Sequence, residues 1–366
     1  MAAAGRVPSR RLEVWSRLGT VAERVLSRDQ QLRALLARQL LLERADLDPV
    51  RAVERVGGLQ TQYSPSGYVG LWSRTAGLRR TDLTDALTSR RVVQGWMMRC
   101  TIHMVSAADW APLTEAVREP RRTWFLRTVP EARSLDMPAV ADRVRGYLAD
   151  GPLKQAEIVA RLAADGLPKA AWTGVQLWLD LVRVPPAGTW GSPRAHVYEL
   201  AERWLGRRAA PVAGRELLVR RYLRGFGPAT PADVARYAGW TITETKEALA
   251  GITLREFRGE EGERLVDLPR APLPPADAPV PVRFLGAWDA VLLLGHASRT
   301  GILPAEHRDK VFHVRMPQST PTFLVDGRVA GTWRFVDGEV RPVPFAPLAD
   351  PEAVAAEAAR LTDFHS

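Results

Sequence analysis

The chain has 366 residues, of which 46% are hydrophobic and 25% charged, as is typical of a globular protein with one large or several small domains. It has no apolar run of about 18 residues, and its first residues lack the apolar centre of a signal peptide, so we expect a cytoplasmic protein without a membrane anchor. Its single cysteine, Cys100, excludes an internal disulfide and a multi-cysteine metal site, and its net charge of +10 favours an acidic partner.

The positive charge is concentrated in the first third of the chain. Residues 1–128 hold 21 arginines and 12 acidic residues, whereas residues 129–366 hold 30 basic and 29 acidic residues. A genomic preference for arginine would explain why the chain has only four lysines, but it would not explain this asymmetry. Because a localised basic field attracts polyanions, we expect DNA as the partner and a place at the nucleoid.

The first unit that the pattern defines is residues 27–135, which follow an Arg-rich arm at 1–26 without a clear pattern. Apolar spacing, N-cap residues and β-rich composition place its elements. A helix is expected over 30–44, and a second from Pro49 to about residue 59, with Asp46 or Asp48 as its N-cap. A third helix is expected over 81–87 with Thr81 as its N-cap, and strands are expected within 92–106.

The second unit, residues 136–210, shows three helical patterns and then a strand, a loop and a strand. The third unit, residues 211–268, repeats this order, with Thr230 as N-cap, Pro231 at the first helical position and Asp233 in a capping box. Three helices followed by a β-hairpin are the winged-helix plan, a variant of the helix-turn-helix. We therefore expect an α+β fold of tandem winged-helix units.

The C-terminal region, residues 283–366, follows a Pro-rich linker at 269–282 and is expected to be rich in β-structure, with a terminal helix after Pro351. Two dipeptides between alternating runs are strong signals for hairpin turns. They are Asp326-Gly327 and Asp337-Gly338. Residues 292–310 are expected to form a polar loop between apolar runs.

The common cofactor and hydrolase motifs are absent from the sequence, which has no phosphate-binding loop, no GxGxxG, no HExxH and no GxSxG. Its six histidines show no spacing that suits a metal site. We expect neither a metal nor another cofactor. The unusual feature that remains is a pair of glutamines, Gln60 and Gln62, at the point where a helix is expected to stop.

Four stretches of the chain carry a resemblance to a known family. They are ARQLLLERADLDPVRAVERVGGLQTQYSPSGYVGLWSR, RRVVQGWMMRCTIHMVSAADW, RYLRGFGPATPADVARYAGW and LVDGRVAGTWRF. From about residue 27 to 345 the sequence resembles the bacterial AlkZ-type winged-helix DNA glycosylases. The resemblance implies that Gln60 and Gln62 are the catalytic Gln-x-Gln motif, whereas a related branch has Gln-x-Asp. The chain departs from the family at Cys100, where glycine is frequent.

The resemblance also implies a substrate class. Members of this branch excise bulky alkylated purines, including crosslinks made by genotoxic natural products, and so protect the producing organism. The residues fit such a reaction. N7-alkylation makes the base a good leaving group, so cleavage needs chiefly a water molecule held against the anomeric carbon. A glutamine carbonyl can accept a hydrogen bond from that water. We expect Gln62 to orient the water and Gln60 to be its partner.

The motif imposes a condition on the backbone. On an α-helix, side chains two residues apart point in nearly opposite directions, whereas in extended backbone they share a face. Gln60 and Gln62 can therefore cooperate only if the preceding helix ends near Leu59 or unwinds there. The structural alternative is that the two amides cap the helix or contact solvent.

Further side chains are expected to contact DNA, although for each the alternative is a solvated cation, a core aromatic ring or a satisfied core histidine. They are Tyr63, Arg90, Arg91, Arg99, Arg121, Arg122, Lys169, Gln176, His296, Arg299, Arg328 and Arg334. Two other functions stay open, a non-catalytic winged-helix DNA-binding protein (a regulator or a lesion-binding shield) and a protein scaffold. No heptad seam suggests a partner protein, so we expect a monomer.

Overall fold

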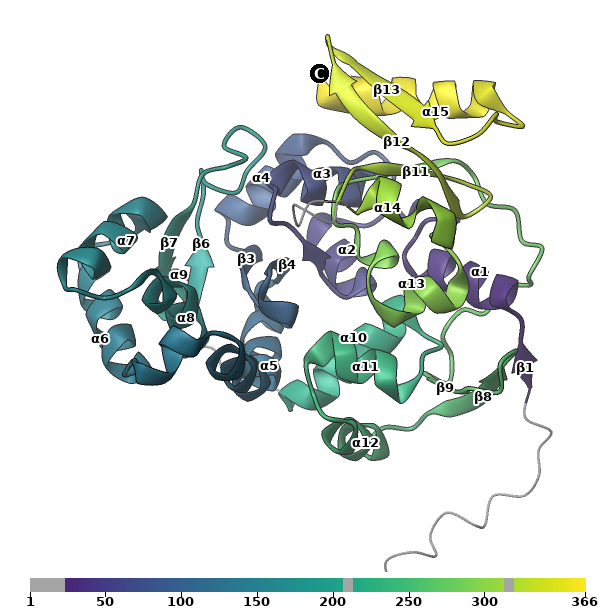
Figure 1. Cartoon of the computed structure of the whole chain (residues 1–366). Helices are drawn as coiled ribbons and strands as arrows, with labels where there is room; N and C mark the ends of the chain where they lie inside the picture. The colour runs from purple at the N-terminus through teal and green to yellow at the C-terminus, as the bar shows by residue number, and fades with distance from the viewer. Residues whose placement is uncertain (1–23, 207–212, 313–318) are drawn as a thin grey trace, which may run out of the picture.

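The computed structural model describes residues 24–206, 213–312 and 319–366, and it shows a mixed α+β protein (Figure 1). Residues 1–23 of the expected arm lie outside the described residues. The chain begins with β1 (Val25–Leu26) and α1 (Arg28–Arg38). Among the described residues, no helix combines the length and hydropathy needed to cross a membrane.

The first set of elements leads to the glutamine pair. Its members are α2 (Pro49–Val56), β2 (Leu59–Gln60), α3 (Ser64–Trp72), α4 (Arg80–Thr88), β3 (Val92–Trp96), the 3₁₀ helix η1 (Met98–Cys100) and β4 (Ile102–Ser106). Both β2 and β3 pair antiparallel with β4, so the short strand between the first two helices joins the hairpin. Asp48 caps α2 as predicted, because its carboxylate accepts the N–H groups of Val50 and Arg51.

The same order of elements occurs twice more. The second set has α6 (Met137–Tyr147), β5 (Leu153–Lys154), α7 (Gln155–Ala164), α8 (Lys169–Trp178), β6 (Leu181–Arg183) and β7 (Val197–Leu200). The third set has α10 (Gly214–Phe226), α11 (Pro231–Ala238), α12 (Ile242–Ala250), β8 (Arg255–Gly259) and β9 (Arg264–Asp267). Each hairpin again receives a segment from between the helices, β5 in the second set and Ala229 in the third. The predicted capping box of Thr230 and Asp233 is confirmed.

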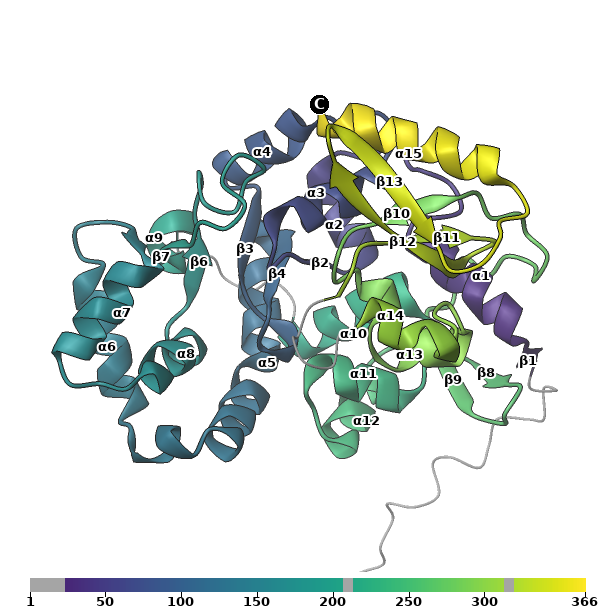
Figure 2. The same ribbon diagram turned by 45° about the horizontal axis from the view of Figure 1, so that its top comes forward.

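The sets are tied together by strand pairing and by one long helix. Pairing of β3 with β6 produces a six-stranded sheet in the order β2-β4-β3-β6-β7-β5. Helix α5 (Ala107–Thr128) lies between the second and third sets and packs against α8 and α10 (Figures 1 and 2). The short helix α9 (Ala201–Leu205) follows β7. Parallel pairing of β1 with β8 extends the third hairpin.

The C-terminal region is a four-stranded antiparallel sheet covered by a helix (Figure 2). Its elements are β10 (Arg283–Leu285), β11 (Thr322–Val325), β12 (Arg328–Val336), β13 (Glu339–Pro344) and α15 (Pro351–His365). The predicted hairpin turns and terminal helix are confirmed, and Asp326, Gly327, Asp337 and Gly338 all have positive φ. The predicted polar loop is wrong, because residues 292–310 contain α13 (Leu294–Thr300) and the start of α14 (Arg308–Val311).

Several predicted boundaries also need correction. The helix predicted over 30–44 ends at Arg38, since Leu40 adopts a left-handed conformation with φ 58°. Helix α4 begins at Arg80 rather than behind Thr81, because Asp82 accepts the backbone N–H of Arg79 at 2.8 Å. The strands predicted within 92–106 are interrupted by η1, and Cys100 lies in this turn, not in a strand.

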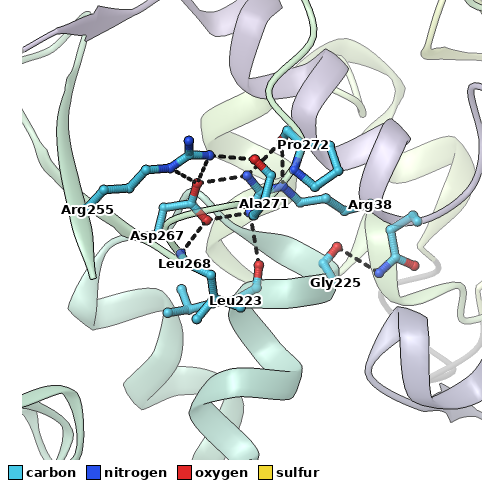
Figure 3. Close-up of polar contacts among 9 residues, drawn as sticks. Arg38, Leu223, Gly225, Arg255, Asp267, Leu268, Ala271 and Pro272 are labelled. Atoms are coloured by element: carbon cyan, nitrogen blue, oxygen red, sulfur yellow. Dashed lines mark hydrogen bonds and ion pairs between the residues drawn. The ribbon is translucent and has the colours of Figure 1, made fainter. Parts of the chain in front are cut away.

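A buried ion-pair network fixes the 269–282 linker against the third set (Figure 3). Arg38 and Asp267 are both fully buried and joined by two hydrogen bonds of 2.6 and 2.9 Å. Arg255 binds the same carboxylate at 2.7 Å. The two arginines also donate to linker carbonyl groups, Arg38 to Pro272 at 2.9 Å and Arg255 to Ala271 at 2.6 Å. The start of the linker is therefore held by two arginine side chains.

Candidate active site

The backbone meets the condition for cooperation between Gln60 and Gln62. Helix α2 ends at Val56, and Gly57 and Gly58 follow in left-handed conformations with φ of 84° and 85°. The chain then enters β2, where Gln60 pairs with His103 of β4. Gln62 follows in a bend just after this strand, and the two amides meet, because Gln60 Nε2 donates to Gln62 Oε1 at 3.0 Å. Neither amide caps α2, because the helix has ended three residues before Leu59.

Arg99 of the η1 turn fixes the direction of this amide pair. Its Nη2 donates to Gln60 Oε1 at 2.5 Å. A guanidinium has only donors, so the Gln60 carbonyl must face Arg99 and the Gln60 amino group must face Gln62. Gln62 therefore accepts with its carbonyl oxygen, which keeps a second lone pair. Because Gln60 is only 6% exposed and Gln62 is exposed, Gln62 is the amide that solvent can reach.

The backbone of the motif is held by the second set of elements. Arg183 of β6 donates from Nη2 to Thr61 O at 2.9 Å and from Nε to Gln94 Oε1 at 2.8 Å. Burial lowers the pKa of Arg183 to about 10. The Thr61 N–H in turn donates to Ile102 O at 2.8 Å. Glycine at position 67 leaves room for the Thr61 side chain, since a Cβ on Gly67 would lie 2.6 Å from Thr61 Cγ2.

His103 lies behind the amides and is a neutral group. Its side chain is 3% exposed, and its Nδ1 lies 3.1 Å from Thr101 O. Burial first, and then the charge of Arg99, lower the pKa of His103 to about 3. A buried imidazole with this pKa stays uncharged near neutral pH, and its Nδ1–H donates to the Thr101 carbonyl group. The geometry therefore leaves the exposed amide of Gln62 as the acceptor for a water molecule.

The turn that carries Arg99 has an unusual backbone. Arg99 and Cys100 adopt successive left-handed conformations, with φ of 55° and 54°. This region is unfavourable for a residue with a Cβ by about 1–2 kcal/mol, and glycine adopts it without that penalty. The geometry accounts for a glycine preference at position 100. Such conformations persist where the surrounding structure imposes them, often at functional sites.

Helix α11 of the third set contacts the site through Tyr237. Tyr237 donates from its hydroxyl group to Gly57 O at 2.9 Å, and its ring lies 5.9 Å from the Arg99 guanidinium carbon. The site is thus assembled from β2, η1, β6 and α11, which are far apart in the sequence. Sequence reasoning missed Arg183 and Tyr237, because no local pattern shows which distant residues reach the motif.

The predicted DNA contacts fall into two groups, those with accessible side chains and those held within the protein. Those at the surface remain predictions, and Tyr63, 42% exposed, has the Arg194 guanidinium 5.6 Å from its ring. The other predicted contacts with exposed or half-buried side chains are Arg90, Arg91, Arg99, Arg122, Lys169, Arg328 and Arg334. Within this group, Arg328 binds Asp29 at 2.6 Å, and Arg90 stacks on Trp204 at 4.2 Å.

Four of the predicted contacts are not on the open surface. His296 is fully buried and donates from Nε2 to Ala290 O at 2.9 Å, so its prediction as a DNA contact is wrong. Arg299 is half-buried, forms an ion pair with Asp233 at 3.2 Å and also donates to Gln31, so two of its guanidinium nitrogens are engaged within the protein. Gln176 is 5% exposed on the packed side of α8, which contradicts its expected role in a groove. Arg121 is 4% exposed and lines a cleft instead of an open face.

Comparisons with known proteins agree with the sequence resemblance. A family model for DNA glycosylase AlkZ-like proteins matches residues 53–364. The interstrand DNA cross-link repair glycosylase of Streptomyces sahachiroi is 24% identical over 360 residues, which cover 89% of this chain and 93% of that protein. The solved structure of Streptomyces sahachiroi DNA glycosylase AlkZ superposes with a TM-score of 0.76 at 21% identity, over 92% of this chain and 96% of that chain, and shows the same fold.

Proposed function

The chain belongs to the AlkZ-like family of DNA glycosylases, and from this premise we propose that it hydrolyses the N-glycosidic bond of N7-alkylated purines in DNA. The observation that carries the proposal is the directed amide pair, in which Arg99 orients Gln60 and Gln60 orients the exposed Gln62. We further propose that the three sets of elements are winged-helix units and that they bind double-stranded DNA as a monomer in the cytoplasm.

In the proposed reaction, Gln62 Oε1 accepts a hydrogen bond from a water molecule and holds it against C1′ of the damaged nucleotide. The water oxygen forms a bond to C1′ as the C1′–N9 bond breaks. The electron pair of that bond moves to the purine and neutralises the charge that alkylation created. The proton released from the water passes to solvent, because a neutral amide cannot keep it. Unmodified bases, which are poor leaving groups, stay intact.

The substrate class follows from the relatives as a proposal. The Streptomyces sahachiroi relative is named for interstrand cross-link repair, and the matched family model covers the glutamine motif and most of the chain. We propose that bulky N7-alkylpurines and interstrand crosslinks are substrates, and that the activity protects a cell against a genotoxic natural product. A water molecule held by an exposed Gln62 can attack C1′ without an enclosed pocket for the base, which suits a bulky adduct.

The test is incubation of the protein with duplex DNA carrying N7-methylguanine, and with a duplex crosslinked through N7 of two guanines. We expect abasic sites, detected by alkaline strand cleavage, and unhooked strands on a denaturing gel. Gln62→Ala should lower the single-turnover rate by roughly 10²-fold or more, with DNA affinity nearly unchanged. Absence of abasic sites from both substrates would refute the proposal and favour a non-catalytic DNA-binding protein.

A further inference from the structure

A positively charged cleft of about 680 Å³ opens beside the η1 turn, between α5 and the segment that joins α11 to α12. Four arginines line it. They are Arg99, Arg121, Arg127 and Arg236. None of them forms an ion pair with another described residue. The two carboxylates at the cleft are already engaged, since Glu119 binds Arg122 at 2.7 Å and Glu244 binds Arg215 at 3.0 Å. Within the described structure the four guanidinium groups therefore have no direct carboxylate partner, although the Cys100 side chain lies against Arg121.

Within the described part of the chain, two of these cations have buried guanidinium nitrogens without a hydrogen-bond partner. Arg121 is 4% exposed, and its Nε and Nη2 have no hydrogen-bond partner among the described residues. Arg99 uses Nη2 for Gln60, but its Nη1 is likewise unpartnered. Burial lowers the pKa of both guanidinium groups. A buried donor without an acceptor is costly, so these nitrogens mark a place where an anion or a water molecule can supply the missing acceptors.

An exposed aromatic ring completes the cleft. Trp124 of α5 is 45% exposed and lines the same cleft as the arginines. Trp240 also lines the cleft but has a structural role, since its Nε1 donates to Ala116 O at 2.9 Å. Cations combined with an accessible aromatic face are the chemistry with which proteins bind a nucleic-acid backbone and its bases.

We propose that this cleft binds a phosphodiester group of the DNA strand that carries the damaged base, with Arg121 and Arg127 as principal donors. Arg99 belongs to both the cleft and the amide pair, so the bound phosphate places the strand in register with Gln62. Arg99 acts here as a positioning residue. The choice of DNA as the polyanion rests on the proposed function, whereas the anion site itself rests on the unpaired arginines.

The test measures binding to undamaged duplex DNA by fluorescence anisotropy over a series of salt concentrations. For Arg121→Met, the slope of log K against log salt should become shallower by about one, as expected for one lost phosphate contact. The same change in slope is expected for Arg127→Met, and because Arg127 is exposed this substitution should leave the fold intact. The matched control is Arg118→Met on the same helix, because Arg118 is held by Asp180 at 3.0 Å and the slope should not change.

Thermal stability and rate separate a binding role from a structural role. Removing a buried unpaired charge should leave the melting temperature of Arg121→Met unchanged or raised. In single-turnover assays of a damaged duplex, Arg121→Met should raise the half-saturating protein concentration with an unchanged plateau rate, whereas Arg99→Met should lower the plateau.

The proposal is overturned if Arg121→Met and Arg127→Met both keep the wild-type salt slope. A lower melting temperature for Arg121→Met together with an unchanged slope for Arg127→Met would likewise assign the cleft a structural role only. Because the duplex is undamaged and the readout is binding, absence of glycosylase activity would refute the proposed function and leave this test standing.

Discussion

Gln60→Glu tests the direction of the amide pair with an isosteric change. The new carboxylate would still accept from Arg99, but it could no longer donate to Gln62 Oε1, since both groups would then be acceptors. Gln62 would relieve the conflict by rotating its amide and donating Nε2 instead. Its carbonyl oxygen would then move away from the water-holding position by the width of an amide group.

The expected effect on catalysis is large and that on stability is favourable. A misplacement of the water by about 1 Å costs roughly 10²-fold in rate, or about 2.7 kcal/mol of transition-state stabilisation. Stability should rise by about 1 kcal/mol, because the half-buried Arg99 gains a charged acceptor in place of a neutral one. Single-turnover glycosylase assays and thermal melting would measure the two effects on the same protein sample.

The matched control is Gln62→Glu, which adds the same charge two residues away. There the group that accepts from Gln60 remains an acceptor, so the hydrogen bond is kept and the rate should stay within about tenfold of wild type. If Gln60→Glu retained the wild-type rate within a few-fold, or if both variants lost activity equally, the directed-pair reasoning would be refuted.

Three other predictions concern stability. Cys100→Gly should raise the free energy of unfolding by about 1 kcal/mol, measured by urea denaturation, since φ is 54° there. Asp267→Asn should lower it by about 3–5 kcal/mol, because two arginines lose their carboxylate in the buried network; a change below 1 kcal/mol would contradict this. Burial lowers the pKa of His103 to about 3 and that of His296 to about 4. When the pH falls from about 7 to 5, each histidine should therefore lower the free energy of unfolding by about 2 kcal/mol, since only the unfolded state binds the added proton. Denaturation at the two pH values, with His103→Gln as comparison, would test this.

Local signals predicted the elements whose stabilising contacts are also local. The Asp48 cap, the Thr230–Asp233 capping box and the two Asp-Gly turns involve residues within three positions of one another, and the structure confirms them. The extended backbone at the glutamine pair was likewise predictable as a condition, because the i to i+2 geometry of helices and strands differs.

The remaining features depend on packing between distant segments. Arg99 lies 39 residues from Gln60, and the sequence marked it only as a basic residue near a strand. The sequence predicts that His296 lies in a polar loop, yet Phe226 stacks on it at 4.7 Å inside the core. No local pattern distinguishes a polar side chain that faces DNA from one whose hydrogen bonds are satisfied in the interior, so burial decides such cases.

The anchored linker has a consequence for how this protein can be recombined. Arg33 donates to Ala278 O at 2.8 Å and Arg38 to Pro272 O at 2.9 Å, so helix α1 holds the 269–282 segment across sequence separations of 245 and 234 residues. A chimera that took its C-terminal sheet from a relative would cut through these contacts. In a chimera, helix α1 and the C-terminal region with its linker should therefore come from the same parent protein.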